Sequence, residues 1–371
     1  MDLMNKDFSH VFTELLGVRW PLIQAPMAGI STPALAAAVS EEGALGSIAI
    51  STISSEKSRE LIHQTRALTT NPFNVNAFVH TPSLSDSKKE AQWLERLRPW
   101  FAEFGHEPPS ELHTPYRSLR DDLEKQQVLL EEAPAVVSFH FGLPKIKFIQ
   151  QLQSSGSRVI ACVTTVPEAL EAEAAGVDMI VAQGFEAGGH RGTFDPHQDE
   201  QLGTLALIPQ VVRAVDIPVI AAGGIASGGG IIAAMALGAC GVQVGTAFVG
   251  CLESAASESY RKVLASDQAL RTQVTRAISG RPARGILNRF IVETQGDELK
   301  IPGYPQTYHA GKALAEAAGQ YGSSEFLGMW AGQAAGLADS GLPAGAVVKR
   351  LVQEAQEISF SLLKNPWTSV P

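Results

Sequence analysis

The sequence predicts an α/β fold, a (β/α)8 TIM barrel with an additional, mainly helical subdomain. Short apolar runs alternate with amphipathic helical segments, eight such runs occur before residue 250, and polar or glycine-rich residues follow nearly every run. Strands buried on both faces and joined by right-handed helical crossovers produce this alternation, and eight units are what a closed barrel requires. A doubly wound open sheet is the alternative, but an open sheet gathers its ligand at one switch point.

The expected strands and helices follow one another along the first two thirds of the chain. The strands are residues 21–27, 44–50, 73–79, 135–141, 158–163, 178–182, 218–222 and 241–245. Helices are expected at 33–40, 167–175 and 227–237, because these segments begin beside a hydroxyl side chain or a proline and are followed by a glycine. Residues 1–250 are therefore predicted to form the barrel.

Two regions interrupt this alternation of strands and helices. Residues 80–134 form an insertion rich in charge and proline, with helices expected at 88–97 and 119–132, and we expect it to cover one side of the barrel mouth. Residues 251–343 are predicted to form the helical subdomain on the substrate side. Residues 344–371 contain a terminal helix that is expected to pack on the barrel.

Composition and charge restrict the partners of the protein. Of its 371 residues, 45% are hydrophobic and 18% are charged, and the formal net charge is -9. A sequence-independent grip on nucleic acid or on an anionic membrane needs a basic face, so we expect neither partner. A small-molecule substrate and a homodimer are both compatible with such a chain.

The cysteines and the N-terminus suggest a compartment. Cys162, Cys240 and Cys251 are unclustered and set in apolar surroundings, which predicts buried thiols rather than a disulfide framework or a metal site. Residues 1–10 lack a basic region followed by an apolar core, and no stretch approaches the length of a membrane span. We therefore expect a cytoplasmic protein without a leader peptide.

Residues 183–192 (QGFEAGGHRG) carry the strongest chemical signal, and they directly follow an expected strand. Gly188 and Gly189 lack a β-carbon, so the backbone there can approach a flat ligand, and His190 can exchange a proton near neutral pH. A structural histidine beside a plain turn is the alternative. Glycines after other strands argue against it, because the same pattern recurs at the same end of the barrel.

Glycines also follow the last two expected strands. Gly223, Gly224, Gly245 and Thr246 offer backbone N–H groups and a hydroxyl, and the helix that begins near Ser227 is expected to point its positive end at the same place. This arrangement predicts a phosphate site, with two tight turns as the alternative. The spacing suits one phosphate better than the pyrophosphate of a dinucleotide.

Other strand ends offer contacts to a planar heterocycle. Residues 24–29 (QAPMAG) follow the first strand, and Asn76 lies in the third, where it is either an amide contact or a turn-forming residue. Ser138 and His140 end the fourth strand, and they point either into the same mouth or into the core.

Together these motifs resemble those of the nitronate monooxygenases, formerly called 2-nitropropane dioxygenases. The resemblance rests on residues 24–29, NVN at 74–76, the stretch 183–192, AGGI at 222–225 and QVGT at 243–246, and it spans residues 20 to 250. It implies a TIM barrel that binds FMN without a covalent link, with His190 as the catalytic base. The implied FMN contacts are Ala25, Pro26, Met27, Asn76, Gln183, Gly188, Gly189, Gly223, Gly224, Gln243, Gly245 and Thr246.

A second motif lies in the predicted subdomain. Tyr304, Tyr308 and Lys312 are spaced by four residues, so on a helix they share one face and can present two phenols and an ammonium to a small anion. They resemble the tyrosine, tyrosine, lysine signature of class I nitronate monooxygenases. An ordinary amphipathic helix with a solvated lysine is the alternative. Tyr116 in the insertion is a further expected substrate-side tyrosine.

The resemblance implies a specific reaction. It is the FMN-dependent oxidation of alkyl nitronates, including propionate 3-nitronate, by O2 to a carbonyl compound and nitrite, with His190 as base for neutral nitroalkanes. The stretch around His190 is also similar to flavin enoyl-acyl-carrier-protein reductases and NADH:quinone reductases, so an NAD(P)H-dependent flavin reductase of quinones or enoyl thioesters is the alternative. A phosphate-binding barrel without a flavin is a third hypothesis.

Overall fold

The computed structural model describes residues 8–363, and its central feature is an eight-stranded parallel sheet in the order β1-β9-β8-β6-β5-β4-β3-β2. The strands are β1 (Leu22–Gln24), β2 (Gly46–Ala49), β3 (Phe73–Phe78), β4 (Val136–His140), β5 (Arg158–Val163), β6 (Met179–Gln183), β8 (Val219–Ala222) and β9 (Gly241–Val244). The two ends of the sheet meet through a parallel bridge between Ile23 and Leu45. The sheet is therefore closed, and the predicted (β/α)8 fold is confirmed.

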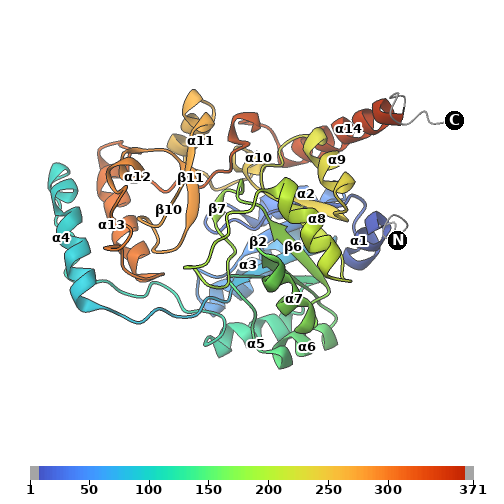
Figure 1. The fold of residues 1–371 in the computed structure, drawn as a ribbon, viewed down its shortest axis with the longest axis horizontal. Helices are drawn as coiled ribbons and strands as arrows, with labels where there is room; N and C mark the ends of the chain where they lie inside the picture. The colour runs from blue at the N-terminus through green and yellow to red at the C-terminus, as the bar shows by residue number, and fades with distance from the viewer. Residues whose placement is uncertain (1–7, 364–371) are drawn as a thin grey trace.

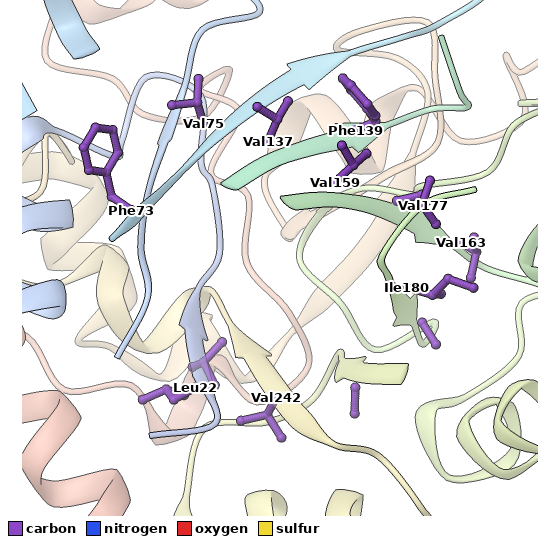
Figure 2. Packing of buried hydrophobic residues seen from close by; sticks show 14 of the residues in the cluster. Leu22, Phe73, Val75, Val137, Phe139, Val159, Val163, Val177, Ile180 and Val242 are labelled. Carbon is purple, nitrogen blue, oxygen red and sulfur yellow. The ribbon is translucent and has the colours of Figure 1, made fainter. Parts of the chain in front are cut away.

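Side chains alternate across the barrel wall, as the pleat of each strand requires. On β5, Val159 and Val163 pack outward against the surrounding helices, whereas Ile160 and Cys162 belong to the cluster inside the barrel. Figure 2 shows members of the outer layer on neighbouring strands, among them Val137 on β4. Burial on both faces explains why these strands are continuous apolar runs in the sequence.

Helices surround the sheet. They are α2 (Pro33–Glu41), α3 (Ser55–Leu68), α5 (Leu123–Glu132), α6 (Ile146–Ser154), α7 (Val166–Ala174), α8 (Thr204–Ala214), α9 (Gly228–Ala236) and the short α10 (Thr246–Val249). Three of them, α2, α7 and α9, begin within one residue of the predicted starts. Thr32 and Thr165 cap α2 and α7 by accepting a backbone N–H, each with a proline in the first turn. Helix α1 (Phe8–Leu16) adds Phe12 to the interior cluster.

The insertion divides between the barrel and the subdomain. Its first helix, α4 (Ser87–Glu103), lies beside α12 (Arg289–Glu293) and α13 (Gln306–Gln320), away from the barrel, so the expectation that it covers the mouth is wrong for this helix (Figure 1). It continues through Pro99, beyond the predicted end, because Trp100 packs into the subdomain core. The second helix, α5, begins at Leu123 rather than 119 because Asp122 caps it.

The subdomain is mainly helical but also holds a small sheet that the sequence did not predict. Besides α12 and α13 it contains α11 (Glu258–Leu264) and two 3-10 turns, Asp267–Leu270 and Ala335–Leu337. Strands β10 (Thr272–Thr275) and β11 (Ala283–Ile286) pair antiparallel, and β11 also pairs with β7 (Gly189–His190). The loop after β6 is thereby joined to the subdomain.

Helix α14 (Ala344–Leu363) packs on the barrel, with Val347 and Leu351 buried in the outer core. Residues 364–371 and 1–7, the latter including most of the stretch on which the leader expectation rests, lie outside the described residues. Between residues 8 and 363, no helix has both the length and the apolar character needed to cross a membrane. Cys162, Cys240 and Cys251 are buried free thiols, as predicted.

Candidate active site

A cavity of ≈ 450 Å³ lies at the carboxyl ends of the strands, between the barrel and the subdomain. This volume is typical of a small-molecule site. The predicted residues that line it are Ala25, Pro26, Met27, Asn76, Tyr116, Gln183, Gly188, Gly189, His190, Gly223, Gly224, Gln243, Gly245, Thr246, Tyr308 and Lys312, and Ser138 and His140 line it as well. The fold thus gathers residues from the ends of the barrel strands and from the subdomain at one place.

Tyr304 is the predicted residue that lies behind the cavity wall. It is buried in a cluster with Tyr116 and Phe141, and its hydroxyl oxygen is 2.8 Å from that of Tyr116. Its ring centroid is 5.7 Å from that of His190. Tyr304 therefore supports two residues of the wall, and its own phenol does not face the cavity.

His190 is held from three sides. Its backbone pairs with Ala283 of β11, and its carbonyl oxygen accepts hydrogen bonds from Gln183 Nε2 at 3.1 Å and His140 Nε2 at 3.2 Å. Its own Nε2 lies 2.9 Å from Ser279 Oγ. The ring of Tyr308 stacks on the imidazole with a centroid separation of 6.2 Å. These contacts leave the ring little freedom to turn.

The surroundings of His190 keep its imidazole neutral. Burial, with smaller contributions from the nearby His140 and Arg281, lowers its pKa to about 3. We expected this group to titrate near neutral pH, but an aromatic cavity next to a buried guanidinium disfavours the imidazolium ion. At physiological pH the ring therefore has a free lone pair and is able to accept a proton.

The two glycines before His190 serve the packing of the chain itself. A β-carbon on Gly188 would lie 2.4 Å from the nitrogen of Gly332, so only glycine lets this subdomain segment approach the loop. Gly189 has a φ of 73°, which favours glycine. The close approach at Gly188 is therefore to backbone of the subdomain, and an approach to a flat ligand stays a prediction.

The glycine-rich turn after β8 also faces the cavity. Gly223 and Gly224 have φ values of 111° and 70°, conformations that favour glycine. Ser227 and Gly228, at the start of α9, are not among the residues that line the cavity, and Glu354 of α14 accepts a hydrogen bond of 2.7 Å from Gly228 N. The carboxylate satisfies the positive end of that helix. A phosphate would depend on the turn itself and on the segment after β9.

That segment supplies a hydroxyl. Thr246 Oγ1 accepts a hydrogen bond of 3.0 Å from Gly332 N, which leaves its proton free to be donated. A β-carbon on the adjacent Gly245 would come within 3.4 Å of Ala25 Cβ, so the glycine keeps this corner of the cavity open.

The three predicted amide contacts differ in what they can offer a ligand. Gln183 is already committed, since its Nε2 donates to His190 O and its Oε1 accepts from Gly192 N at 2.8 Å. Asn76 donates to Ser138 Oγ at 2.9 Å, which leaves its carbonyl oxygen for a ligand. Within residues 8–363, the side chain of Gln243 forms no hydrogen bond, so both its carbonyl oxygen and its NH2 group are free for a ligand.

Tyr308 and Lys312 form the side of the cavity opposite the barrel. Lys312 Nζ lies 4.8 Å from the ring centroid of Tyr308, and no carboxylate of the described chain forms an ion pair with it. Although Lys312 is exposed on its outer side, partial burial lowers its pKa. An unpaired ammonium in an acidic protein favours an anionic ligand.

Comparison with known proteins identifies the family of the chain. The sequence profile of the nitronate monooxygenase family matches residues 9–354. The chain belongs to this family. It is 51% identical to a nitronate monooxygenase of Pseudomonas aeruginosa over 92% of this chain and 98% of the relative, and 50% identical to one of Paraburkholderia phytofirmans over 92% and 94%. Nitronate monooxygenases are oxidoreductases, so the protein is an enzyme of that class.

Solved structures extend the likeness of this nitronate monooxygenase family member to the whole fold. A nitroalkane oxidase of Streptomyces ansochromogenes superposes with a TM-score of 0.86 at 39% identity, over 94% of this chain and 99% of that one. FabK of Thermotoga maritima superposes with a TM-score of 0.74 at 31% identity, over 95% and 97%.

Three residues of the site were not predicted from the sequence. Ser279 contacts the imidazole of His190, and the Trp330 ring lies 5.3 Å from it. The guanidinium of Arg191, which is fully buried, pairs with Asp199 at 2.9 Å and braces the loop before it. A serine or tryptophan in an irregular segment carries no motif. Arg191 lies inside the predicted stretch 183–192, so its position could have indicated a role.

Proposed function

We propose that this enzyme binds FMN and oxidises alkyl nitronates, including propionate 3-nitronate, with O2 to a carbonyl compound and nitrite. The observation that carries the proposal is the convergence of a neutral imidazole, a phenol and an unpaired ammonium on one cavity, from His190, Tyr308 and Lys312. A nitronate is a small anion with two oxygens beside the reacting carbon, and these groups match that charge and size.

The cavity has the chemistry that FMN needs. Met27, Cys162 and other apolar side chains line one part of it, as a flat ring system requires, and the free amide of Gln243 can contact ring nitrogens and oxygens. The positive φ values at Gly223 and Gly224 turn the backbone at the place proposed for the phosphate. When bound, FMN supplies the electron-transfer chemistry. The residues of the protein bind the substrate and orient it beside the flavin.

The side chains of the protein have three tasks in this proposal. Lys312 and the Tyr308 hydroxyl bind and orient the nitronate oxygens, and the cation stabilises their negative charge. His190 accepts the proton from the α-carbon when the substrate is a neutral nitroalkane. Trp330 and the subdomain cover the cavity and exclude water from it.

NAD(P)H-dependent reduction of a quinone or enoyl thioester is the second candidate function. The observation that supports it is the 31% identity to FabK of Thermotoga maritima. It differs from the first in its electron donor. The cytoplasmic location and the homodimer remain predictions from the sequence.

Oxygen uptake and nitrite release test the proposal directly. Purified enzyme that is yellow with bound flavin should consume O2 and release nitrite when a preformed alkyl nitronate is added, and should oxidise NADH far more slowly. Rapid NADH oxidation with a quinone and no response to nitronates would favour the second candidate. A colourless protein that does not take up added FMN would refute both.

A further inference from the structure

The hydroxyl of Ser279 lies at the centre of a small hydrogen-bond network behind His190. Its Oγ is 2.9 Å from His190 Nε2, 3.1 Å from the carbonyl oxygen of Arg281 and 3.3 Å from the backbone nitrogen of Arg281. The side chain of Ser279 is fully buried, so these three groups are its partners and solvent is not.

The three partners decide where the single hydroxyl proton goes. The carbonyl oxygen of Arg281 can only accept a hydrogen bond, and its backbone N–H can only donate one. Ser279 Oγ therefore donates to the carbonyl oxygen and accepts from the N–H. If the proton pointed at His190, the oxygens of Ser279 and Arg281 would face each other at 3.1 Å with no hydrogen between them. The proton therefore belongs on the side of the carbonyl, and Ser279 Oγ accepts from the imidazole.

The other ring nitrogen of His190 has no such partner. No hydrogen bond to Nδ1 occurs in the described part of the chain, and Nδ1 is not among its fully buried polar atoms that lack a partner. Since His190 lines the cavity, Nδ1 is the nitrogen that remains accessible there. A neutral imidazole carries one proton, so a proton on Nε2 leaves the lone pair on Nδ1.

We propose that Ser279 is a positioning residue that sets the tautomer of His190, with the proton on Nε2 and the lone pair on Nδ1, so that Nδ1 is the atom that accepts a proton from substrate. The role in proton transfer rests on the proposed function, whereas the tautomer is a property of the protein alone. In the transfer, the C–H bond of a nitroalkane breaks, its electron pair stays on the nitroalkane to form the nitronate, and the proton binds to Nδ1. Ser279 continues to accept from Nε2, and this hydrogen bond stabilises the imidazolium ion.

The backbone around Ser279 explains why a serine can do this. Gly280 has a φ of 89°, and a β-carbon there would lie 2.7 Å from the carbonyl carbon of Gly303. The turn is thus held tightly against the segment before α13, and it returns the chain so that both backbone groups of Arg281 reach the hydroxyl. The acceptor geometry is built before substrate arrives.

The tautomer can be measured without any turnover. We would label histidine with ¹⁵N, record ring nitrogen shifts of the flavin-loaded enzyme at pH 7, and assign the His190 signals by their loss in His190→Asn. The expected result is a protonated Nε2 and an unprotonated Nδ1. A protonated Nδ1 in the wild-type enzyme would overturn the inference, whatever the reaction proves to be.

Variants connect the tautomer to catalysis. Ser279→Ala should mix the two tautomers and lower kcat/KM for a neutral nitroalkane roughly 10- to 100-fold, less than the roughly 10²- to 10⁴-fold contribution of the general base itself. Turnover of preformed nitronate should change little, and Ser279→Thr should restore both the spectrum and the rate. Ser157→Ala is the matched control, because Ser157 is also buried and its hydroxyl has no partner in the described chain.

The outcomes distinguish the role of Ser279 from the proposed reaction. If the tautomer is as expected but nitronates are not oxidised, the proposed function fails and the positioning role of Ser279 holds. If nitronates are oxidised but Ser279→Ala leaves both the spectrum and the nitroalkane rate unchanged, Ser279 does not set the tautomer. Equal losses on nitroalkane and nitronate, with the spectrum unchanged, would also count against it.

Discussion

The phenol oxygens of Tyr116 and Tyr304 lie 2.8 Å apart, and this hydrogen bond joins the insertion to the segment before α13. Burial raises the pKa of both phenols, so each stays protonated and one donates to the other. Tyr116 lines the cavity and Tyr304 does not. The hydrogen bond between the two phenols therefore holds Tyr116 of the cavity wall against the segment that contains Tyr304.

Removing one hydroxyl of this pair should affect stability more than binding. Tyr304→Phe leaves the buried hydroxyl of Tyr116 without its partner, and we expect the free energy of unfolding to fall by about 1 to 3 kcal/mol. KM for a nitronate should change less than threefold, because Tyr304 does not face the cavity. Denaturant unfolding and steady-state kinetics would measure both.

The double variant provides the control for this pair. Tyr116→Phe combined with Tyr304→Phe removes both hydroxyl groups, so it should be no less stable than Tyr304→Phe alone. A large rise in KM for Tyr304→Phe at unchanged stability would show that Tyr304 contacts substrate directly.

The charge of Lys312 should discriminate among nitronates. Lys312→Met removes the unpaired cation and keeps much of the stem, so KM should rise about tenfold for a carboxylated nitronate, the effect of roughly 1.4 kcal/mol, and much less for a simple alkyl nitronate. Lys262→Met is a matched control, because Lys262 is exposed on α11 and pairs with Glu258 at 2.6 Å. Equal effects on both substrates would assign Lys312 to the solvated surface.

Much of the fold could be predicted from the sequence because its signals are local. The eight barrel strands are apolar runs that end near glycines, and each lies within a few residues of its predicted bounds. The small sheet was missed for a physical reason. Strand β7 has only two residues, and β10 is half-buried at every position, so neither shows an apolar run or a clear alternation.

Some residues of the candidate site could also be predicted from local signals in the sequence, and others could not. His190 and the glycines could be predicted because they follow strands directly. Ser279 could not, since it is 89 residues from His190 and reaches it only through the pairing of β7 with β11. Glu354 is 126 residues from Gly228, and no local pattern indicates that its carboxylate accepts a hydrogen bond from the first turn of α9.

The turn after β8 can be tested through flavin content. Gly224 has a φ of 70°, and a β-carbon there would lie 3.2 Å from Glu186 Cβ, so Gly224→Ala should shift the turn and reduce bound FMN at least severalfold. Absorbance after gel filtration would report the flavin per chain. Gly176→Ala is the matched control, because its φ of 84° carries similar strain with no atom within 4 Å. Equal flavin loss in both variants would indicate general destabilisation.

The buried His80 and the half-buried His140 and His190 should make the protein sensitive to acid. Burial lowers the pKa of His80 and His190 to about 3 and that of His140 to about 4, below the 6.5 of an unfolded chain. The unfolded state therefore binds more protons below pH 6.5, so the free energy of unfolding should fall as the pH is lowered from 7 to 5. Near pH 5 the slope should approach about 4 kcal/mol per pH unit.

Denaturant unfolding at several pH values would measure this slope. His80→Gln should reduce it by about one third, because one of the three titrating imidazoles is removed. A free energy of unfolding that is constant between pH 5 and 7 would contradict the burial of neutral imidazoles.

The role of His190 as a base makes the most specific kinetic prediction. A neutral nitroalkane differs from its nitronate by one proton on carbon, and the imidazole has to accept that proton only from the nitroalkane. His190→Asn should therefore lose about 10² to 10⁴ in kcat/KM for a nitroalkane, if the enzyme accepts one, yet keep much of its turnover on preformed nitronate. The side-chain amide of asparagine can donate a hydrogen bond to a nitro oxygen, so the variant keeps a polar group at this position.

The low pKa of His190 adds a second criterion to this comparison. Because that pKa is about 3, protonation of His190 should not reduce kcat/KM for a nitroalkane between pH 8 and pH 5, whereas a base that titrates near 6.5 would lose most of its activity there. Both substrates should be measured over this range with the FMN content of each preparation known. A parallel collapse on both substrates in His190→Asn, with FMN retained, would make His190 an electrostatic or positioning residue, because a base is needed for only one of them.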